Sequence, residues 1–372
     1  MEGEIGLRAA GWGVGRRPRF RAPSLMLLGS LAVGACARLP VYNPVLPPLP
    51  TASLRADEIV AMPDGARLPV REWLPVGPPR AVILALHGFN DSRDAWELPG
   101  PEFARAGVAI VAPDQRGFGA APMRGHWPGA TVLADDAASL LRWLRGRYPG
   151  AKLYAMGESM GGAVLMTLAT RPDPPKVDGW ILVSPAVWGR QQMGVVLSSG
   201  LWLVSSVLPG LSVTGNEVQL RVTASDNREA LLRLARDPLT IRRTRFDTLR
   251  GLADLMDDAQ AASPHLPRNV LVLSGEKDMI VPVKATARAW RDMPADVRRA
   301  LYPSGYHLLL RDKGRMSVIH DILAWLAAPA APLPSGADRW AQMWLEWRVA
   351  TAGDSPALGE AAGPRYGVRT DP

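Results

Sequence analysis

Short apolar runs alternate along most of the chain with longer amphipathic segments. Runs of strand length and composition lie at 81–86, 108–112, 153–156, 179–183, 269–273 and 299–302. Segments with apolar residues at helical spacing lie between or after them, at 133–148, 283–290 and 316–326. Apolar strands that alternate with helices are typical of a mostly parallel sheet covered by helices on both faces. Residues 58–62 and 67–74, separated by Pro63-Asp64-Gly65, predict a hairpin that precedes this sheet.

The segment 152–170 predicts a tight turn between a strand and a helix. Its apolar start leads into Gly157-Glu158-Ser159-Met160-Gly161, and small and apolar residues at helical spacing follow. In this context a G-x-S-x-G turn holds the serine hydroxyl clear of the strand end, above the unpaired first amides of the helix. The simpler alternative is a glycine turn with an incidental serine, because so short a motif also arises by chance in a chain with 36 glycines.

Polar residues follow the ends of three other apolar runs: His87-Gly88-Phe89, Asp278 and His307. Ligands of open parallel sheets bind at the carboxyl ends of the strands. We therefore expect these three segments to lie near Ser159 in the folded protein.

In these motifs, and in the order Ser159, Asp278, His307, the chain resembles the α/β-hydrolases. Among them it is similar to the group of monoacylglycerol lipases and lysophospholipases, over about residues 54–326. The resemblance implies an α/β-hydrolase fold, with Ser159 as the nucleophile and His307 as its general base. It also implies that Asp278 orients His307 and stabilises its protonated form.

The same resemblance places the oxyanion site on backbone atoms. The N–H of Met160, directly after the serine, and the N–H of Phe89, directly after His87-Gly88, would hold the developing negative charge. Changes of these two side chains are therefore expected to be milder than Ser159→Ala. A serine at the turn, in place of an aspartate, argues against epoxide hydrolase or dehalogenase chemistry.

Other histidines and aspartates compete for the catalytic roles. His87 is expected to shape its own loop, and the remaining histidines lie in loops or inside a helix: His126, His265 and His320. The rivals of Asp278 lie in a helical stretch, where a solvated face is the usual role: Asp254, Asp257 and Asp258. Asp114 and Arg116 are expected to pin the loop after 108–112.

The alternation of strands and helices stops between two predicted parts of the hydrolase core, 54–185 and 266–328. Residues 186–265, after the sixth strand, are predicted to form a helical cap over the active site. No charged residue occurs between Arg190 and Glu217, and a proline and several serines make an amphipathic lid a better interpretation than a membrane span. The lid either lines an acyl-chain site, contacts a membrane or packs on the body. The basic residues that follow either meet anionic groups or form a solvated face: Arg233, Arg236, Arg242, Arg243 and Arg245.

Residues 1–35 resemble a bacterial lipoprotein signal. A basic segment, Arg16 to Arg21, precedes a short apolar run, and Val33-Gly34-Ala35-Cys36 matches a lipobox. The resemblance implies cleavage before Cys36, acylation of that cysteine and a lipid anchor in a membrane. An ordinary signal peptide or a retained N-terminal helix is the alternative. Residues 36–53 are rich in proline and predict an extended spacer.

Residues 329–372 are predicted to form a C-terminal extension. It contains a helix at 337–350 and then a disordered tail from 351 onwards. One face of the helix carries an apolar stripe that either packs on the body or lies at a bilayer interface: Trp340, Met343, Trp344 and Trp347.

Composition narrows the range of partners. The net charge of +8 falls to +5 without residues 1–35, which hold five arginines and two glutamates. This mildly basic balance suits an anionic membrane surface and is too small and dispersed to indicate nucleic acid. The single cysteine, Cys36, excludes an internal disulfide. The sequence shows no His/Cys cluster and no phosphate-binding glycine loop, so no metal and no organic cofactor is expected.

These observations predict a serine hydrolase that cleaves carboxylic esters of lipids, of monoacylglycerol lipase or lysophospholipase type. The expected location is the bacterial cell envelope, and Ala37 after Cys36 favours the outer over the inner membrane. The alternatives are a short-chain carboxylesterase or thioesterase, and a non-catalytic lipoprotein that uses the fold for binding. Peptidase activity also occurs on this fold. Acyl-chain length, headgroup and oligomeric state are left open by the sequence.

Overall fold

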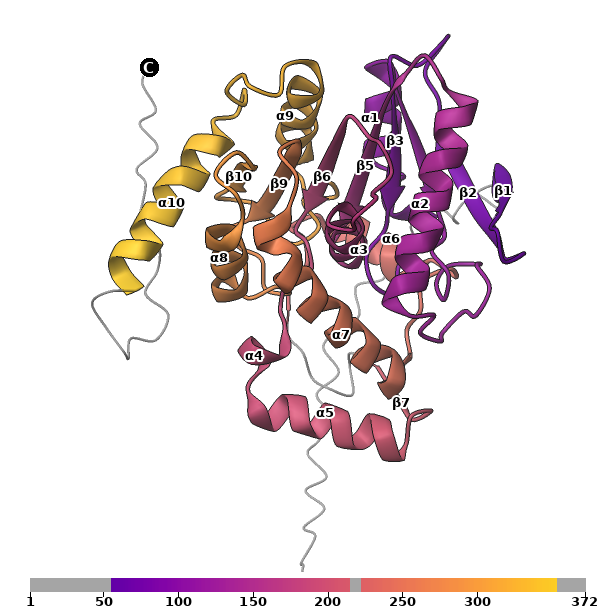
Figure 1. The fold of residues 1–372 in the computed structure, drawn as a ribbon, viewed down its shortest axis with the longest axis vertical. Coiled ribbons are helices and arrows are strands. Elements are labelled where there is room, and N and C mark those ends of the chain that lie inside the picture. The colour runs from indigo at the N-terminus through magenta and orange to yellow at the C-terminus, as the bar shows by residue number, and fades with distance from the viewer. Residues whose placement is uncertain (1–54, 215–221, 353–372) are drawn as a thin grey trace, which may run out of the picture. The chain divides into compact units, whose positions relative to one another are not determined.

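A central eight-stranded sheet organises the protein (Figure 1). The computed structural model describes residues 55–214 and 222–352. In the sheet the strand order is β1-β2-β4-β3-β5-β6-β9-β10. The strands are β1 (Glu58–Ala61), β2 (Arg67–Trp73), β3 (Ala81–Leu86), β4 (Val108–Pro113), β5 (Lys152–Glu158), β6 (Gly179–Val183), β9 (Val270–Gly275) and β10 (Arg298–Tyr302).

The sheet is mostly parallel, as predicted. All neighbouring strands from β4 to β10 pair in parallel, whereas β1 pairs antiparallel with β2, and β2 pairs antiparallel with β4. The predicted hairpin at 58–62 and 67–74 is therefore present, and it extends one edge of the sheet. The apolar runs correspond to strands that are buried on both faces, so that both sets of alternating side chains are apolar.

Helices cover both faces of the sheet. Two apolar clusters lie on opposite faces, and consecutive strand residues such as Val82 and Ile83 belong to different clusters. One cluster includes residues of α2 (Ala130–Arg147), α3 (Met160–Ala169), α7 (Phe246–Ala262) and α8 (Val283–Asp292). The other includes residues of η2 (Arg93–Trp96), α1 (Pro99–Arg105) and α9 (Arg315–Ala327).

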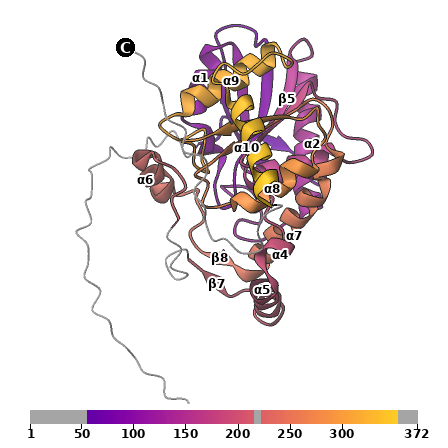
Figure 2. The same ribbon diagram turned by 90° about the vertical axis from the view of Figure 1, so that its left-hand side faces the viewer.

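A long segment between β6 and β9 interrupts the alternation of strands and helices. Figure 2 shows α5, β7 and β8 grouped together, with α6 apart from them. Within the range predicted as the cap, α7 packs against α3 and contributes to the core cluster. The elements of this segment are α4 (Arg190–Met193), α5 (Val195–Val207), β7 (Ser212–Val213), α6 (Arg228–Arg236), β8 (Thr244–Arg245), α7 and η3 (Ser263–His265).

The last helix, α10 (Ala337–Ala352), packs beside β10 at the end of the sheet opposite to β1 (Figure 1). Its Trp344 is 4% exposed and meets Trp290 of α8 edge to face, with ring centroids 5.5 Å apart. At Trp344, therefore, the predicted apolar stripe packs on the body of the protein. Met343 is exposed.

Several expectations concern residues outside the described ranges. These are the lipoprotein signal, the lipobox with Cys36, the proline-rich spacer and most of the tail predicted from 351 onwards, whose first two residues instead end α10. In the described part of the chain, every helix is too short or too polar to cross a bilayer.

Candidate active site

Ser159 lies on a strained turn between β5 and α3. Its backbone has φ 53° and ψ −113°, a combination that residues other than glycine rarely adopt. The Ser159 N–H donates to the Val183 carbonyl at 2.9 Å, and the Ala186 N–H donates to the Ser159 carbonyl at 3.0 Å. These bonds join the turn to the end of β6, so the serine is fixed at the carboxyl ends of the strands.

Glycines allow the elements around Ser159 to approach closely. A Cβ on Gly157 would lie 2.4 Å from the carbonyl carbon of Gly161, and one on Gly161 would lie 2.4 Å from the carbonyl oxygen of Leu86. Both distances are too short for any other residue without movement of the backbone. A Cβ on Gly88 would lie 3.4 Å from the Ser159 Cβ, so the loop after β3 passes directly beside the serine.

Asp278 and His307 form a buried pair on the loops after β9 and β10. His307 Nδ1 lies 2.7 Å from Asp278 Oδ2, and the side chains are each about 5% exposed. The other carboxylate oxygen accepts the N–H groups of Ile280 at 2.8 Å and Val281 at 2.9 Å. Because a carboxylate only accepts, His307 donates from Nδ1, and Nε2 of the neutral ring is left as an acceptor.

A cavity of about 1110 Å³ joins the predicted groups. Ser159, His307 and Phe89 all line it. Met160 is the first residue of α3, where a backbone N–H has no acceptor within its own helix. Within residues 55–214 and 222–352, neither the Phe89 N–H nor the Met160 N–H donates to another group. The structure thus brings together all five residues predicted for the site.

Most of the cavity wall is apolar and comes from the segment between β6 and β9. Its apolar residues include Trp188, Met193, Leu197, Leu201, Val204, Phe246, Leu249, Leu252 and Met256. Typical small-molecule pockets have volumes of about 300–1,000 Å³. The cavity is therefore large enough for an extended apolar ligand.

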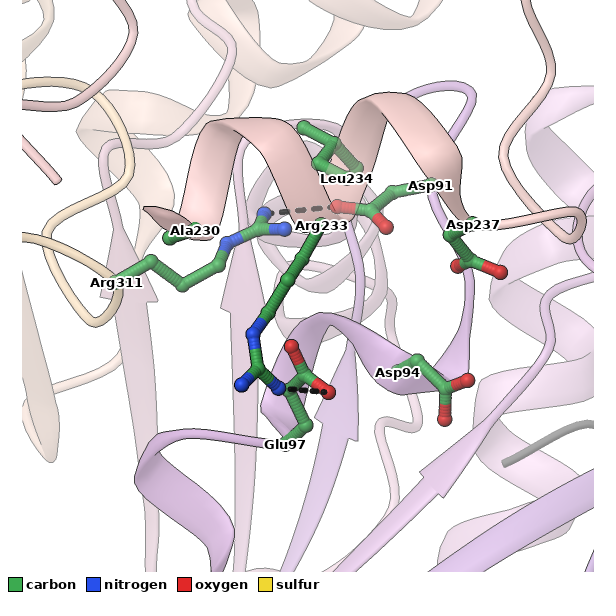
Figure 3. Close-up of a pocket in the computed structure, with 8 residues that line it drawn as sticks. All are labelled: Asp91, Asp94, Glu97, Ala230, Arg233, Leu234, Asp237 and Arg311. Carbon is green, nitrogen blue, oxygen red and sulfur yellow. Dashed lines mark ion pairs between the residues drawn. The ribbon is translucent and has the colours of Figure 1, made fainter. Parts of the chain in front are cut away.

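A buried ion-pair group forms a polar corner of the same cavity. Arg311 Nη2 lies 2.8 Å from Asp91 Oδ2 and 2.5 Å from Glu158 Oε2. Figure 3 shows the pair of Arg311 and Asp91 beneath α6. Burial raises the pKa of Glu158, and the charge of Arg311 opposes this effect. No motif in the sequence marks these three residues, although each lies within four positions of a predicted site residue.

His87 has the structural role expected of it. Its side chain is fully buried, its Nε2 accepts the Gln115 N–H at 3.0 Å, and its Nδ1 lies 2.7 Å from the Gly88 carbonyl oxygen. The ring is therefore neutral, with its proton on Nδ1. Burial lowers the pKa of His87, in agreement with this state.

The other histidines and aspartates that could have taken the catalytic roles lie outside the site. His126, His265 and His320 are exposed. Asp254 and Asp257 pair with Arg190, and Asp258 lies on the exposed face of α7. Asp114 pairs with Arg93, and Arg116 pairs with Asp64 and Asp136.

Comparison with known proteins supports this reading of the fold. The chain is 26% identical over 285 residues to the monoacylglycerol lipase of Mycolicibacterium smegmatis, with 74% of this chain and 99% of the relative covered. It is 26% identical over 276 residues to the monoglyceride lipase of Homo sapiens, covering 72% and 89% respectively.

Solved structures show the same fold at lower sequence identity. The monoacylglycerol lipase of Paleococcus ferrophilus superposes with a TM-score of 0.59 at 23% identity, over 70% of this chain and 98% of that one. A soluble variant of the monoglyceride lipase of Saccharomyces cerevisiae, in complex with a substrate analog, gives a TM-score of 0.61 at 20% identity, over 72% and 94%.

A family model described as Hydrolase_4, serine aminopeptidase S33, matches residues 77–314. The match runs from the turn before β3 to the segment after His307, and so includes the serine turn, the acid loop and the histidine loop. This protein belongs to the Hydrolase_4 family of α/β-hydrolases.

Proposed function

We propose that this protein is a serine hydrolase that cleaves carboxylic esters of lipids through an acyl-enzyme on Ser159. The observation that carries the proposal is the large apolar cavity with Ser159 and His307 in its wall. In the first step Nε2 of His307 takes the proton of Ser159 as its oxygen attacks the ester carbonyl. The same proton then goes to the leaving alcohol, and water activated by His307 releases the fatty acid.

The groups around Ser159 support the charges that develop in these steps. The N–H groups of Phe89 and Met160 are available to hold the oxyanion. Asp278 keeps the His307 ring in the tautomer that leaves Nε2 free, and its charge stabilises the protonated ring. The two N–H groups of Ile280 and Val281 fix the orientation of the Asp278 carboxylate.

A neutral headgroup fits the polar corner better than an anionic one. Arg311 is the only lysine or arginine among the described residues that line the cavity, and both Asp91 and Glu158 pair with it. A phosphate would meet two carboxylates there and no unpaired cation, so its desolvation would not be compensated. We infer that monoacylglycerols are preferred over lysophospholipids whose headgroup is anionic.

The same corner argues against aminopeptidase activity. An aminopeptidase needs an anionic group to bind the charged amino terminus of its substrate. In the described lining of the cavity, the acidic side chains are Asp91 and Glu158, and Arg311 already engages both. The apolar wall provides an acyl-chain site in place of a peptide site.

The proposed setting is the surface of a membrane in the bacterial cell envelope, with the outer membrane favoured. Acylation of Cys36 would supply the anchor. The outward face of the cap supports membrane contact, because it exposes a group of large apolar side chains: Val195, Leu197, Trp202, Leu203, Val207, Leu208 and Leu211. Val195 and Leu197 also line the cavity, so this surface is continuous with the proposed acyl-chain site.

Reaction with a fluorophosphonate ester, read by intact mass, tests the proposal. We expect a single adduct on the purified full-length protein and none on Ser159→Ala, since only an activated serine reacts. A panel of short- and long-chain monoacylglycerols, an anionic lysophospholipid, a thioester and an amino-acid anilide then defines the substrate. Rapid hydrolysis of long-chain monoacylglycerol is the expected result. If the folded wild-type protein forms no adduct, the protein is not a serine hydrolase, and a binding role takes its place.

A further inference from the structure

Arg311 joins three segments that carry the proposed reacting groups: its own histidine loop, the loop after β3 and the serine turn. It lies four residues after His307, and its side chain is 6% exposed. Its Nη2 contacts Asp91 of the loop after β3 and Glu158 at the end of β5, at 2.8 and 2.5 Å. A single nitrogen thus bridges two carboxylates from separate parts of the chain.

Each of these carboxylates is adjacent to a group with a proposed role. Asp91 lies two residues after Phe89, whose N–H is assigned to the oxyanion site. The N–H of Asp91 donates to the Gly88 carbonyl at 3.3 Å. Glu158 directly precedes Ser159 and is 2% exposed. A shift of either carboxylate would therefore move an oxyanion N–H or the nucleophile.

Because Arg311, Asp91 and Glu158 are buried, their charges must stay paired for the folded state to be stable. A buried charge is stable only when it is paired, and removal of one partner leaves the other charge uncompensated. Burial by itself would lower the pKa of Arg311, but Asp91 and Glu158 raise it overall, so the guanidinium stays charged. The cap is joined to the same residue, since Asn227 Nδ2 donates to the Arg311 carbonyl oxygen at 2.9 Å.

We propose that Arg311 is a positioning residue that fixes the oxyanion loop, the serine turn and the histidine loop relative to one another. This inference rests on the proposed function and adds a residue to it. The ester carbonyl oxygen needs both oxyanion N–H groups most strongly in the transition state, whereas the acyl chain binds in the apolar part of the cavity. Loss of Arg311 should therefore lower kcat and leave KM nearly unchanged.

Arg311→Met, Arg311→Lys and a matched control, Arg147→Met, provide the test. Arg147, the last residue of α2, also bridges two carboxylates, Glu58 and Glu72, and it does not line the cavity. With a soluble ester we expect Arg311→Met to lower kcat by about 10- to 100-fold, the size of effect that a small misplacement of catalytic groups produces. The rate of fluorophosphonate reaction should fall in parallel. Arg311→Lys should recover part of kcat, and Arg147→Met should retain wild-type kcat and KM.

Further variants keep the proposal testable if Arg311→Met does not fold. Asp91→Asn and Glu158→Gln each keep the shape of the side chain and remove one charge, and together they should reduce kcat more than either alone. A folded Arg311→Met, or a folded double variant, with wild-type kcat and fluorophosphonate rate would overturn the proposal. If the wild-type protein itself neither reacts nor hydrolyses esters, the proposed function fails, which is a separate result from an active wild type with an equally active variant.

Discussion

One carboxylate, Asp278, holds His307 with one oxygen and the backbone of its own loop with the other. Oδ2 lies 2.7 Å from His307 Nδ1, and Oδ1 accepts the N–H groups of Ile280 and Val281. The carboxylate therefore cannot turn without loss of backbone hydrogen bonds. The orientation of the imidazole is determined by the loop after β9, and not by the histidine loop alone.

Asp278→Asn should abolish most activity while the fold is retained. The amide oxygen can still accept the N–H groups of Ile280 and Val281, but its NH₂ group would then face His307 Nδ1. Two donors cannot share this contact, so the ring takes the tautomer with its proton on Nε2, which cannot accept from Ser159. We expect kcat for a soluble ester to fall by about 10⁴-fold with little change in KM. The control is Asp258→Asn on the exposed face of α7, which should keep the wild-type kcat. A kcat of Asp278→Asn within tenfold of wild type would contradict the assignment of Asp278.

The serine turn depends on close packing that alanine should disturb at Gly161. A Cβ there would lie 2.4 Å from the carbonyl oxygen of Leu86, so α3 would have to move away from β3. We expect Gly161→Ala to lower the free energy of unfolding by about 1–3 kcal/mol, as overpacking typically does. Gly146→Ala is the matched control, because Gly146 lies in α2 and, apart from the backbone of its own helix, no atom lies within 4 Å of the added Cβ. It should stabilise the protein by about 0.5–1 kcal/mol. Chemical denaturation measures both values, and equal effects would exclude the steric explanation.

The strands and the serine turn could be predicted from the sequence because their patterns are local. Strands buried on both faces must be apolar at every position, which makes runs such as 81–86 visible. The turn at Ser159 requires glycine at fixed offsets, and this also leaves a short pattern. Asp278 and His307 could be predicted because each follows the end of a strand, in the order that the resemblance to the α/β-hydrolases implies.

The polar corner could not be predicted, since it depends on contacts between distant segments. Glu158 and Arg311 are 153 positions apart, and nothing in the sequence near either residue specifies that they pair. Residues 246–262 fall within the predicted cap, and their contact with α3 could not be foreseen for a related reason. The sequence of α7 gives an amphipathic helix, and only the folded chain shows that its apolar face packs on α3.

The outward face of α5 gives a prediction about substrate presentation. Trp202 and Leu203 are each 57% exposed and do not line the cavity. If this face contacts a membrane, the double variant Trp202→Glu and Leu203→Glu should bind anionic vesicles less tightly. We expect hydrolysis of monoacylglycerol in such vesicles to fall by about tenfold, in line with the loss of about 1.4 kcal/mol in binding. Hydrolysis of a soluble short-chain ester should be retained.

A matched surface variant separates this effect from a general change in charge. Leu74 and Val76, between β2 and β3, are exposed as well, so the double variant Leu74→Glu and Val76→Glu adds the same two negative charges outside the cap. It should leave the vesicle assay unchanged. An equal loss in both variants would show that the apolar face of α5 has no specific part in access to lipid.

Asp237 should make the folded protein less stable as the pH rises. Figure 3 shows it at the end of α6 near Asp91 and Asp94, with Arg233 and Arg311 directed to other carboxylates. Burial raises the pKa of Asp237, although hydrogen bonds from the Leu239 N–H and the Ser92 hydroxyl oppose the shift. A folded-state pKa above the unfolded value means that the stabilising contribution is complete below the unfolded pKa. It is lost as the pH rises through the folded-state pKa.

Asp237→Asn should remove this pH dependence. At pH 8 we expect the Tm of the variant to exceed that of wild type by about 1–3 °C, and the difference should disappear at about pH 4. Asp64→Asn is the control of opposite sign, because the hydrogen bond from Arg116 lowers the pKa of Asp64 to about 2. Its Tm should be lower than that of wild type at pH 7, and this deficit should fade as the pH falls towards 2. A Tm for Asp237→Asn that is lower than that of wild type at pH 8, with a deficit that fades towards pH 4, would show instead that the carboxylate stabilises the cap in its ionised form.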